Sequence, residues 1–259
     1  MAKKNSGSIG VWILFGIAVL LLSAAWLMKS FPVLIFAALA PLFAISDQAK
    51  DHSSPWNRFE LILLALGIAL LAAHAFDFSF VVFAAIQAIA LTLAFVGYAF
   101  AYQSLGPRLG KFTIIFFWLG LEYLFLKLPW NTDVTYLANA LQLQPGWHNW
   151  TTYTGYLGVT LWILVVNLLF YQAVFKPSGF NVYYFIAALI FIVIPVVYSI
   201  QMKEEGIGYS HMMQLYAFTV TGALPGKYSQ QGEVVARTAA WVSVLIILLS
   251  FVKNYTRKK

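Results

Sequence analysis

Residues 180–200 read FNVYYFIAALIFIVIPVVYSI and contain no charged side chain. An α-helix needs about 20 apolar residues to cross the hydrocarbon core of a bilayer. This stretch meets that requirement, and so do Ile9–Met28 and Phe80–Tyr102. The three runs therefore predict transmembrane helices.

The composition of the whole chain is that of a membrane protein. Of its 259 residues, 61% are hydrophobic and only 10% are charged, which excludes a soluble domain. Five further apolar segments are candidate spans: Phe31–Ile45, Phe59–Phe76, Phe112–Trp130, Tyr153–Phe175 and Val234–Val252. We predict an all-α, polytopic transmembrane helical bundle of about eight spans, with residues 1–259 in a single domain.

The basic residues predict how these spans are oriented. With eight spans and a cytoplasmic amino terminus, eleven of the sixteen Lys and Arg residues fall in cytoplasmic segments, as the positive-inside rule requires. They are Lys3, Lys4, Lys50, Arg58, Arg108, Lys111, Lys176, Lys253, Arg257, Lys258 and Lys259. Both termini are then cytoplasmic, and the net charge of +7 reflects topology and contact with anionic lipid head groups. Nucleic acid is not an expected partner, because these residues are spread over separate short loops.

Several kinds of chemistry are excluded by what the sequence lacks. The chain has no cysteine, which rules out disulfides, thiolate metal sites and a cysteine nucleophile. It also has no P-loop, Rossmann, Gly-x-Ser-x-Gly or zinc signature. We expect no cofactor, no metal site and no catalytic residue. An acid–base pair of two loop histidines, His148 and His211, stays open as an alternative.

Two predicted outer loops stand out by their length, 131–152 and 201–235. The second is polar and Gly-rich, with aromatic residues interleaved. The first carries regularly spaced apolar residues that predict one face of a short helix lying in the outer membrane interface. These residues are Val134, Leu137, Leu141 and Leu143, together with Tyr136.

Two polar residues lie deep within predicted spans. Glu122 stands near the middle of Phe112–Trp130, where a charge costs at least about 2.5 kcal/mol on insertion scales. Asn167 stands in the middle of Tyr153–Phe175. Such residues either face a partner or a watery cavity, or they join helices by hydrogen bonds. Both interpretations stay open for Glu122, and the pattern favours the second for Asn167.

Aromatic and small residues gather in PGWHNWTTYTGYLG at residues 145–158. They predict either an ordinary Trp/Tyr belt at head-group depth or a rim that binds lipid or a partner protein. The candidate rim residues are Trp130, Trp147, His148, Trp150, Tyr153 and Gly155.

Five stretches together carry a family resemblance. SFPVLIFAALAPLFAI (30–45) has a Phe-Pro turn and a short Ala/Leu span ending in Pro-Leu. FFWLGLEYLFLKLPWN (116–131) is an aromatic span with an internal Glu and a terminal Pro-Trp. LANALQLQPGWHNWTTYTGYLGVTLWILVVNLL (137–169) has a Trp-rich loop, Tyr-Thr-Gly and an Asn in the following span. With IPVVYSI (194–200) and GKYSQQGEVVARTAAWVSVLIILLSFV (226–252), they resemble in order the membrane part of bacterial apolipoprotein N-acyltransferase, which adds the third acyl chain to lipoproteins.

The resemblance implies a protein of the bacterial inner membrane, but one departure is large. In that family a nitrilase-like domain with a Glu-Lys-Cys triad lies between the seventh and eighth spans, and here that interval is residues 201–235. Because the chain has no cysteine, the family's thioester intermediate cannot form. The resemblance therefore implies a pseudoenzyme that binds membrane lipid or lipoprotein, or a membrane subunit of a larger complex.

Two alternatives remain at this point. The chain is an acyltransferase component that works with a separate catalytic chain or by a cysteine-free mechanism, or it is a small transporter that uses Glu122.

Overall fold

The computed structural model describes residues 10–28, 31–50, 56–130, 133–150, 154–176, 179–204 and 228–257, and this part of the chain is helical and has no strand. The predicted all-α class is therefore confirmed. Six helical segments are long and apolar enough to cross a bilayer: Pro32–Ala49, Trp56–Ala73, Phe78–Leu105, Leu157–Phe175, Val182–Met202 and Val235–Thr256. The other two predicted spans correspond to shorter apolar helices, α1 (Val11–Leu27) and α7 (Thr113–Leu126).

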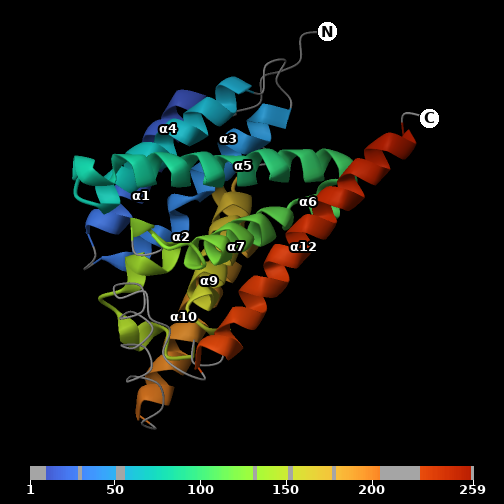
Figure 1. Ribbon diagram of the computed structural model, residues 1–259. Coiled ribbons are helices and arrows are strands. Elements are labelled where there is room, and N and C mark those ends of the chain that lie inside the picture. Colours follow the sequence, from blue (N-terminus) through green and yellow to red (C-terminus); the bar gives the residue numbers. More distant parts are fainter. Residues whose placement is uncertain are drawn as a thin grey trace.

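The helices pack into one bundle in which neighbours in sequence are mostly neighbours in space (Figure 1). The amino-terminal half contains α2 (Ile35–Ala38), α3 (Ala40–Lys50), α4 (Trp56–Ala73) and α5 (Val81–Leu105). In this half α1 packs against α3 and α4, and α4 packs against α5. The last helix, α12 (Tyr228–Arg257), runs diagonally across the bundle and packs against α5 and α7. The carboxy-terminal helix therefore packs against two helices from the middle of the chain.

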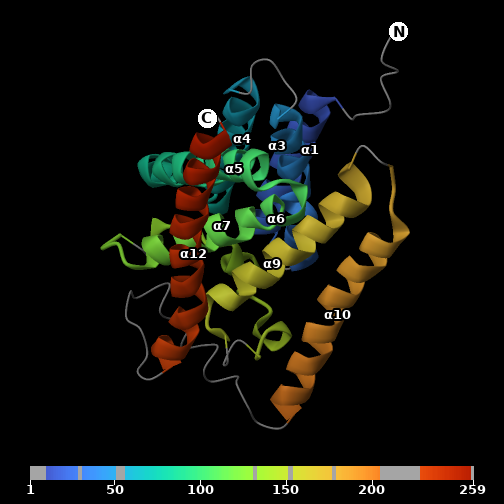
Figure 2. The same cartoon turned by 90° about the vertical axis from the view of Figure 1, so that its right-hand side faces the viewer.

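Helix α9 (Leu157–Phe170) lies at the centre of the bundle, where it contacts α2, α7 and α10 (Val182–Glu204). In the apolar segment that contains α9, 72% of the residues are buried. In the segments of α10 and α12, only 17% and 22% of the residues are buried. Figure 2 shows α10 at the edge of the bundle beyond α9. The wide apolar surfaces of α10 and α12 suit contact with lipid chains, since such a surface exposed to water would be unfavourable.

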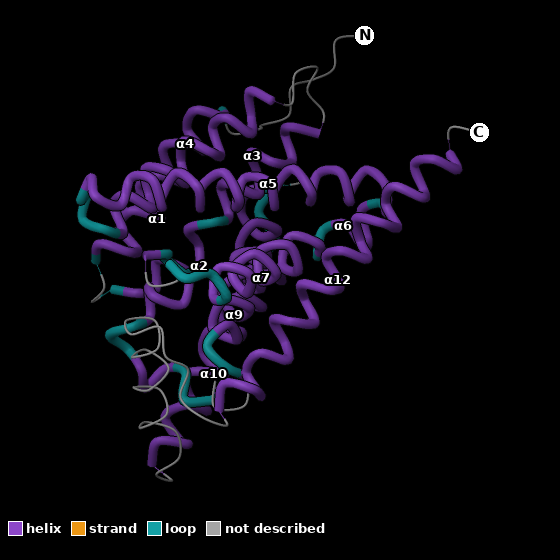
Figure 3. Tube along the Cα trace, viewed as in Figure 1, coloured by secondary structure: helices purple, strands orange, loops and turns teal. Residues whose placement is uncertain are grey.

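Short helical turns and loops join these helices (Figure 3). The turns are η1 (Pro32–Leu34), η2 (Phe78–Phe80), α6 (Pro107–Gly110), η4 (Leu137–Leu141), η5 (Pro145–Trp147) and the π-helical turn η6 (Tyr171–Phe175).

The two long loops are described in part. Val134, Leu137 and Leu141 are buried in the core and only Leu143 is exposed, so the apolar residues of this segment pack against the bundle. Its position at the outer membrane interface stays a prediction. In the interval 201–235, α10 continues to residue 204 and α12 begins at residue 228. Residues 205–227 lie outside the described part of the chain.

Candidate functional site: buried polar contacts and a lateral groove

Glu122 of α7 is fully buried and joins three parts of the bundle. Its Oε1 accepts hydrogen bonds from Trp118 Nε1 and from the Leu137 backbone N–H, each at 3.0 Å. Its Oε2 accepts a hydrogen bond from Thr160 Oγ1 at 2.6 Å. The carboxyl group thus links α7 to η4 and α9 with both oxygens engaged. This arrangement favours the helix-joining interpretation of Glu122, because a buried polar group is tolerated when hydrogen bonds satisfy it.

A second polar contact holds the same loop against α5. The Thr135 N–H donates to Gln87 Oε1 at 3.2 Å, and Gln87 Nε2 donates to the Thr135 carbonyl. Thr135 Oγ1 also lies 3.0 Å from His74 Nε2, and the His74 ring stacks on Phe80 with a centroid distance of 4.2 Å. These contacts explain why residues 133–143 enter the bundle. Gln87 was not among the residues predicted from the sequence, although an uncharged polar residue within an apolar segment is a signal for such a role.

Asn167 of α9 bridges a break between α2 and α3. Its Oδ1 accepts a hydrogen bond from the Leu39 N–H at 2.7 Å, and its Nδ2 donates to the Ile35 carbonyl at 2.8 Å. A second Nδ2 hydrogen bond reaches the Ile163 carbonyl at 2.9 Å. Pro41 adds to the break, because proline has no N–H and its ring clashes with the carbonyl four residues earlier. The amide of Asn167 is therefore occupied by backbone groups.

The candidate rim residues divide between two parts of the bundle. Trp130 packs against Phe83 of α5 and Phe125 of α7, with ring centroids 5.8 and 6.2 Å apart. Trp150 packs instead edge-on against Trp162 of α9 at 5.6 Å. These two tryptophans therefore pack against different helices.

The remaining rim candidates lie in or near the turn into α9. Gly155 is buried and has φ +75°, a left-handed conformation that favours glycine and turns the chain into α9. Trp147 is partly buried against the core. Tyr153 lies outside the described residues.

His148 is buried, with 1% of its surface exposed, and its Nε2 lies 3.4 Å from the Leu141 carbonyl oxygen. Burial lowers the pKa of His148 to about 4, because the charged imidazolium would lose its solvation. The ring is therefore neutral at physiological pH and inaccessible to a substrate. His211, its proposed acid–base partner, lies outside the described residues.

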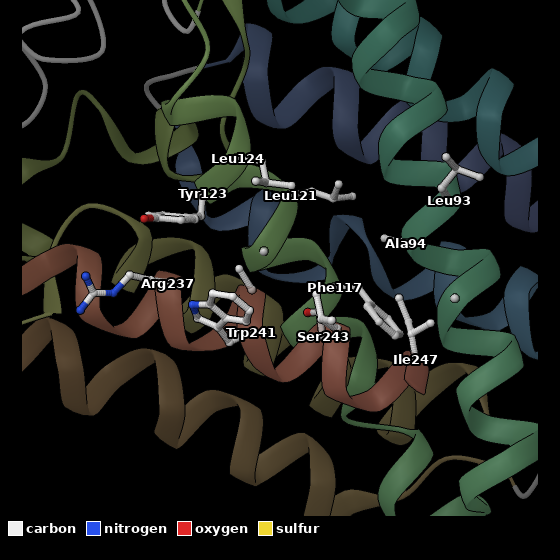
Figure 4. Close-up of a pocket in the computed structure, with 14 residues that line it drawn as sticks. Leu93, Ala94, Phe117, Leu121, Tyr123, Leu124, Arg237, Trp241, Ser243 and Ile247 are labelled. Atoms are coloured by element: carbon white, nitrogen blue, oxygen red, sulfur yellow. The ribbon is translucent and has the colours of Figure 1, made fainter. Parts of the chain in front are cut away.

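A groove of about 640 Å³ lies where α12 meets α5 and α7 (Figure 4). This volume is within the range of small-molecule sites. Its walls are almost entirely apolar, with Leu93 from α5, Phe117 from α7 and Ile247 from α12. Tyr123 and Arg237 lie together at one end, and Leu93 and Ile247 lie toward the other. This groove could not be predicted from the sequence, because its three walls come from distant parts of the chain.

The groove opens on the side of the bundle. Leu93, Trp241 and Val244 line it and keep 61%, 67% and 47% of their surfaces exposed. Its floor is formed where α7 and α12 approach closely at Gly120. A Cβ atom on Gly120 would lie 3.1 Å from Ala240 Cα, so glycine allows this approach. The groove is therefore open along one side of the bundle.

The chain has no detected similarity to a known protein that would assign its function. The chain matches no protein-family model, no curated protein and no solved structure. Within the described ranges, no group of three or more His, Cys, Asp and Glu residues is placed to hold a metal ion. The functional interpretation therefore depends on the groove and on the buried polar contacts.

Proposed function

We propose that this chain is a multi-pass protein of the bacterial inner membrane that binds a membrane lipid, or the acyl chain of a lipoprotein, without catalysing a reaction. In this proposal the six long and two short apolar helices give eight spans, and both termini are cytoplasmic. The observation that carries the proposal is the apolar, sideways-open groove between α5, α7 and α12.

The dimensions of the groove fit one acyl chain. Arg237 and Ile247 lie ten positions apart on α12, which corresponds to about 15 Å at the rise of an α-helix. The hydrocarbon core of a bilayer is about 30 Å thick, so the groove extends over roughly one leaflet. A lipid that occupies it keeps its chain among the apolar walls and its head group near Arg237.

The buried polar groups Glu122 and His148 favour lipid binding over transport or acyl transfer. A transporter needs a carboxyl that can exchange its proton or its ligand, and both oxygens of Glu122 accept hydrogen bonds from within the bundle. Cysteine-free acyl transfer needs an accessible base, and His148 is buried. Neither alternative is favoured by a residue that the structure describes.

Val244→Trp tests this proposal by filling the groove. Val244 lines the groove and is 47% exposed, so a larger side chain enters the open space without removing core packing. Leu245→Trp is the matched control, because Leu245 is the next residue of α12, is 61% exposed and does not line the groove. The measurement is mass spectrometry of lipids and proteins that remain bound after gentle detergent extraction.

We expect bound lipid in the wild-type protein and in Leu245→Trp, and at least tenfold less in Val244→Trp. Equal lipid in all three proteins would overturn the groove as the binding site. A stoichiometric protein partner without bound lipid would identify the chain as a subunit of a complex instead.

A further inference from the structure

One end of the groove carries positive charge. Arg237 is exposed and lies at this end beside Tyr123 (Figure 4). Lys127, the first residue after α7, places its Nζ 5.4 Å from the centre of the Tyr123 ring. Two cations from distant parts of the chain, Arg237 and Lys127, therefore lie near Tyr123, which lines the groove.

Hydrogen-bond donors gather near Arg237 at this end of the groove. Among the residues that the structure describes, the Arg237 guanidinium has no hydrogen-bonding or ion-paired partner. Trp241 follows one helical turn later and also lines the groove, so its indole lies at the same end. Arg, Tyr and Trp offer hydrogen-bond donors, and the planar guanidinium matches the oxygen geometry of a phosphate.

We infer that the groove selects an anionic phospholipid, whose phosphate lies at Arg237 and Lys127 while one acyl chain fills the apolar part. This inference rests on the proposed lipid-binding function and adds the class of head group. Two positive charges complement a net negative head group, whereas a zwitterionic head group brings its own ammonium close to the same cations. A cation near an anionic lipid surface contributes a preference of about fivefold.

The test compares two lipids in one bilayer. The protein is reconstituted in nanodiscs that contain equal amounts of phosphatidylglycerol and phosphatidylethanolamine, released, and analysed by native mass spectrometry for the lipid that stays bound. We expect phosphatidylglycerol to be enriched roughly twentyfold on the wild-type protein, about fivefold from each of the two cations. Arg237→Gln and Lys127→Gln should each reduce this enrichment about fivefold, and Arg237→Lys should retain most of it because the charge is kept.

Lys253→Gln is the matched charge control. Lys253 is exposed near the other end of α12, about 24 Å from Arg237 along the helix, and should leave the enrichment unchanged. Arg237 and Lys127 are both exposed, so their replacement removes little packing, and an unchanged melting temperature confirms the fold of each variant.

The outcomes separate this inference from the proposed function. If wild-type protein binds both lipids equally and Val244→Trp abolishes that binding, the head-group inference is overturned and the lipid-binding function stands. The same conclusion follows if enrichment is unaffected by Arg237→Gln and Lys127→Gln. If Val244→Trp binds as much lipid as the wild-type protein, the proposed function itself fails.

Discussion

The side-chain amide of Asn167 replaces a helical hydrogen bond of Leu39. In an uninterrupted α-helix the Leu39 N–H would donate to the Ile35 carbonyl. Here Asn167 accepts a hydrogen bond from the Leu39 N–H and donates one to the Ile35 carbonyl, so its amide lies between the two backbone groups. Insertion of a side chain into the hydrogen-bond ladder is a known cause of helix breaks. The break between α2 and α3 is therefore stabilised from a helix that is distant in sequence.

Asn167→Leu should destabilise the protein by about 2–4 kcal/mol, because two buried backbone groups lose their partner. Pro41→Ala should reduce this cost, since an alanine at position 41 allows the helix to close and lets Leu39 bond directly to Ile35. A double-mutant cycle of unfolding free energies in mixed micelles measures the coupling. Additive effects of the two substitutions would contradict this account of the break.

Glu122→Gln should leave stability close to that of the wild-type protein, whereas Glu122→Leu should lower it by about 3 kcal/mol or more. The amide oxygen of Gln still accepts from Trp118 and Leu137, and its NH₂ group can donate to the Thr160 hydroxyl. Leucine leaves all three donors unsatisfied. Thermal unfolding in detergent measures the difference.

The same Glu122→Gln protein separates a structural role from transport. A pH-dependent flux in proteoliposomes that is present in the wild-type protein and lost in Glu122→Gln would show that the carboxyl exchanges protons, and the structural assignment would then be incomplete.

The stability of the protein should depend on pH through His148. Burial lowers the pKa of His148 to about 4, below its ordinary value of about 6.5. The unfolded state then binds more protons than the folded state between these two values. The stabilisation is complete above pH 6.5 and is lost as the pH falls toward 4, by up to about 3 kcal/mol.

His148→Gln should remove this contribution, because glutamine does not titrate. Melting temperatures of both proteins from pH 8 to pH 4 provide the measurement, and the difference between the curves isolates His148 from the other titrating groups. Parallel curves over the whole range would show that the ring is protonated equally in both states.

Gly120→Val should destabilise the protein by about 1–3 kcal/mol and change the groove, because the added atoms collide with the α12 backbone at Ala240. Gly67→Ala is an instructive contrast, since a Cβ on Gly67 of α4 meets nothing within 4 Å. That change should be neutral or stabilising by up to about 1 kcal/mol, because alanine favours a helix. Thermal unfolding and the amount of co-purified lipid measure both effects. Unchanged values for Gly120→Val would show that α7 and α12 do not need their close approach.

The positions of the helices could be predicted from the sequence because membrane insertion depends on local properties. A run such as Phe180–Ile200 forms a helix in lipid wherever its neighbours lie, since each backbone group must find a partner within its own segment. All eight predicted spans correspond to helices or helical segments. The depth of Glu122 and Asn167 within their spans was visible for the same reason.

The partners of these residues were decided only by the tertiary structure. Asn167 and Leu39 are 128 positions apart, and the groove brings together Leu93, Gly120 and Trp241 from three helices. Periodicity and composition describe one helix at a time, so they do not indicate which helices meet or where a glycine allows a close approach. The spacing of apolar residues in 133–143 suits a membrane interface as well as a protein core, and only the structure shows the hydrogen bonds to Glu122 and Gln87 that hold this segment against the bundle. The sequence alone thus determined which segments form the long apolar helices, and long-range packing determined the groove, because its shape depends on contacts that no local pattern encodes.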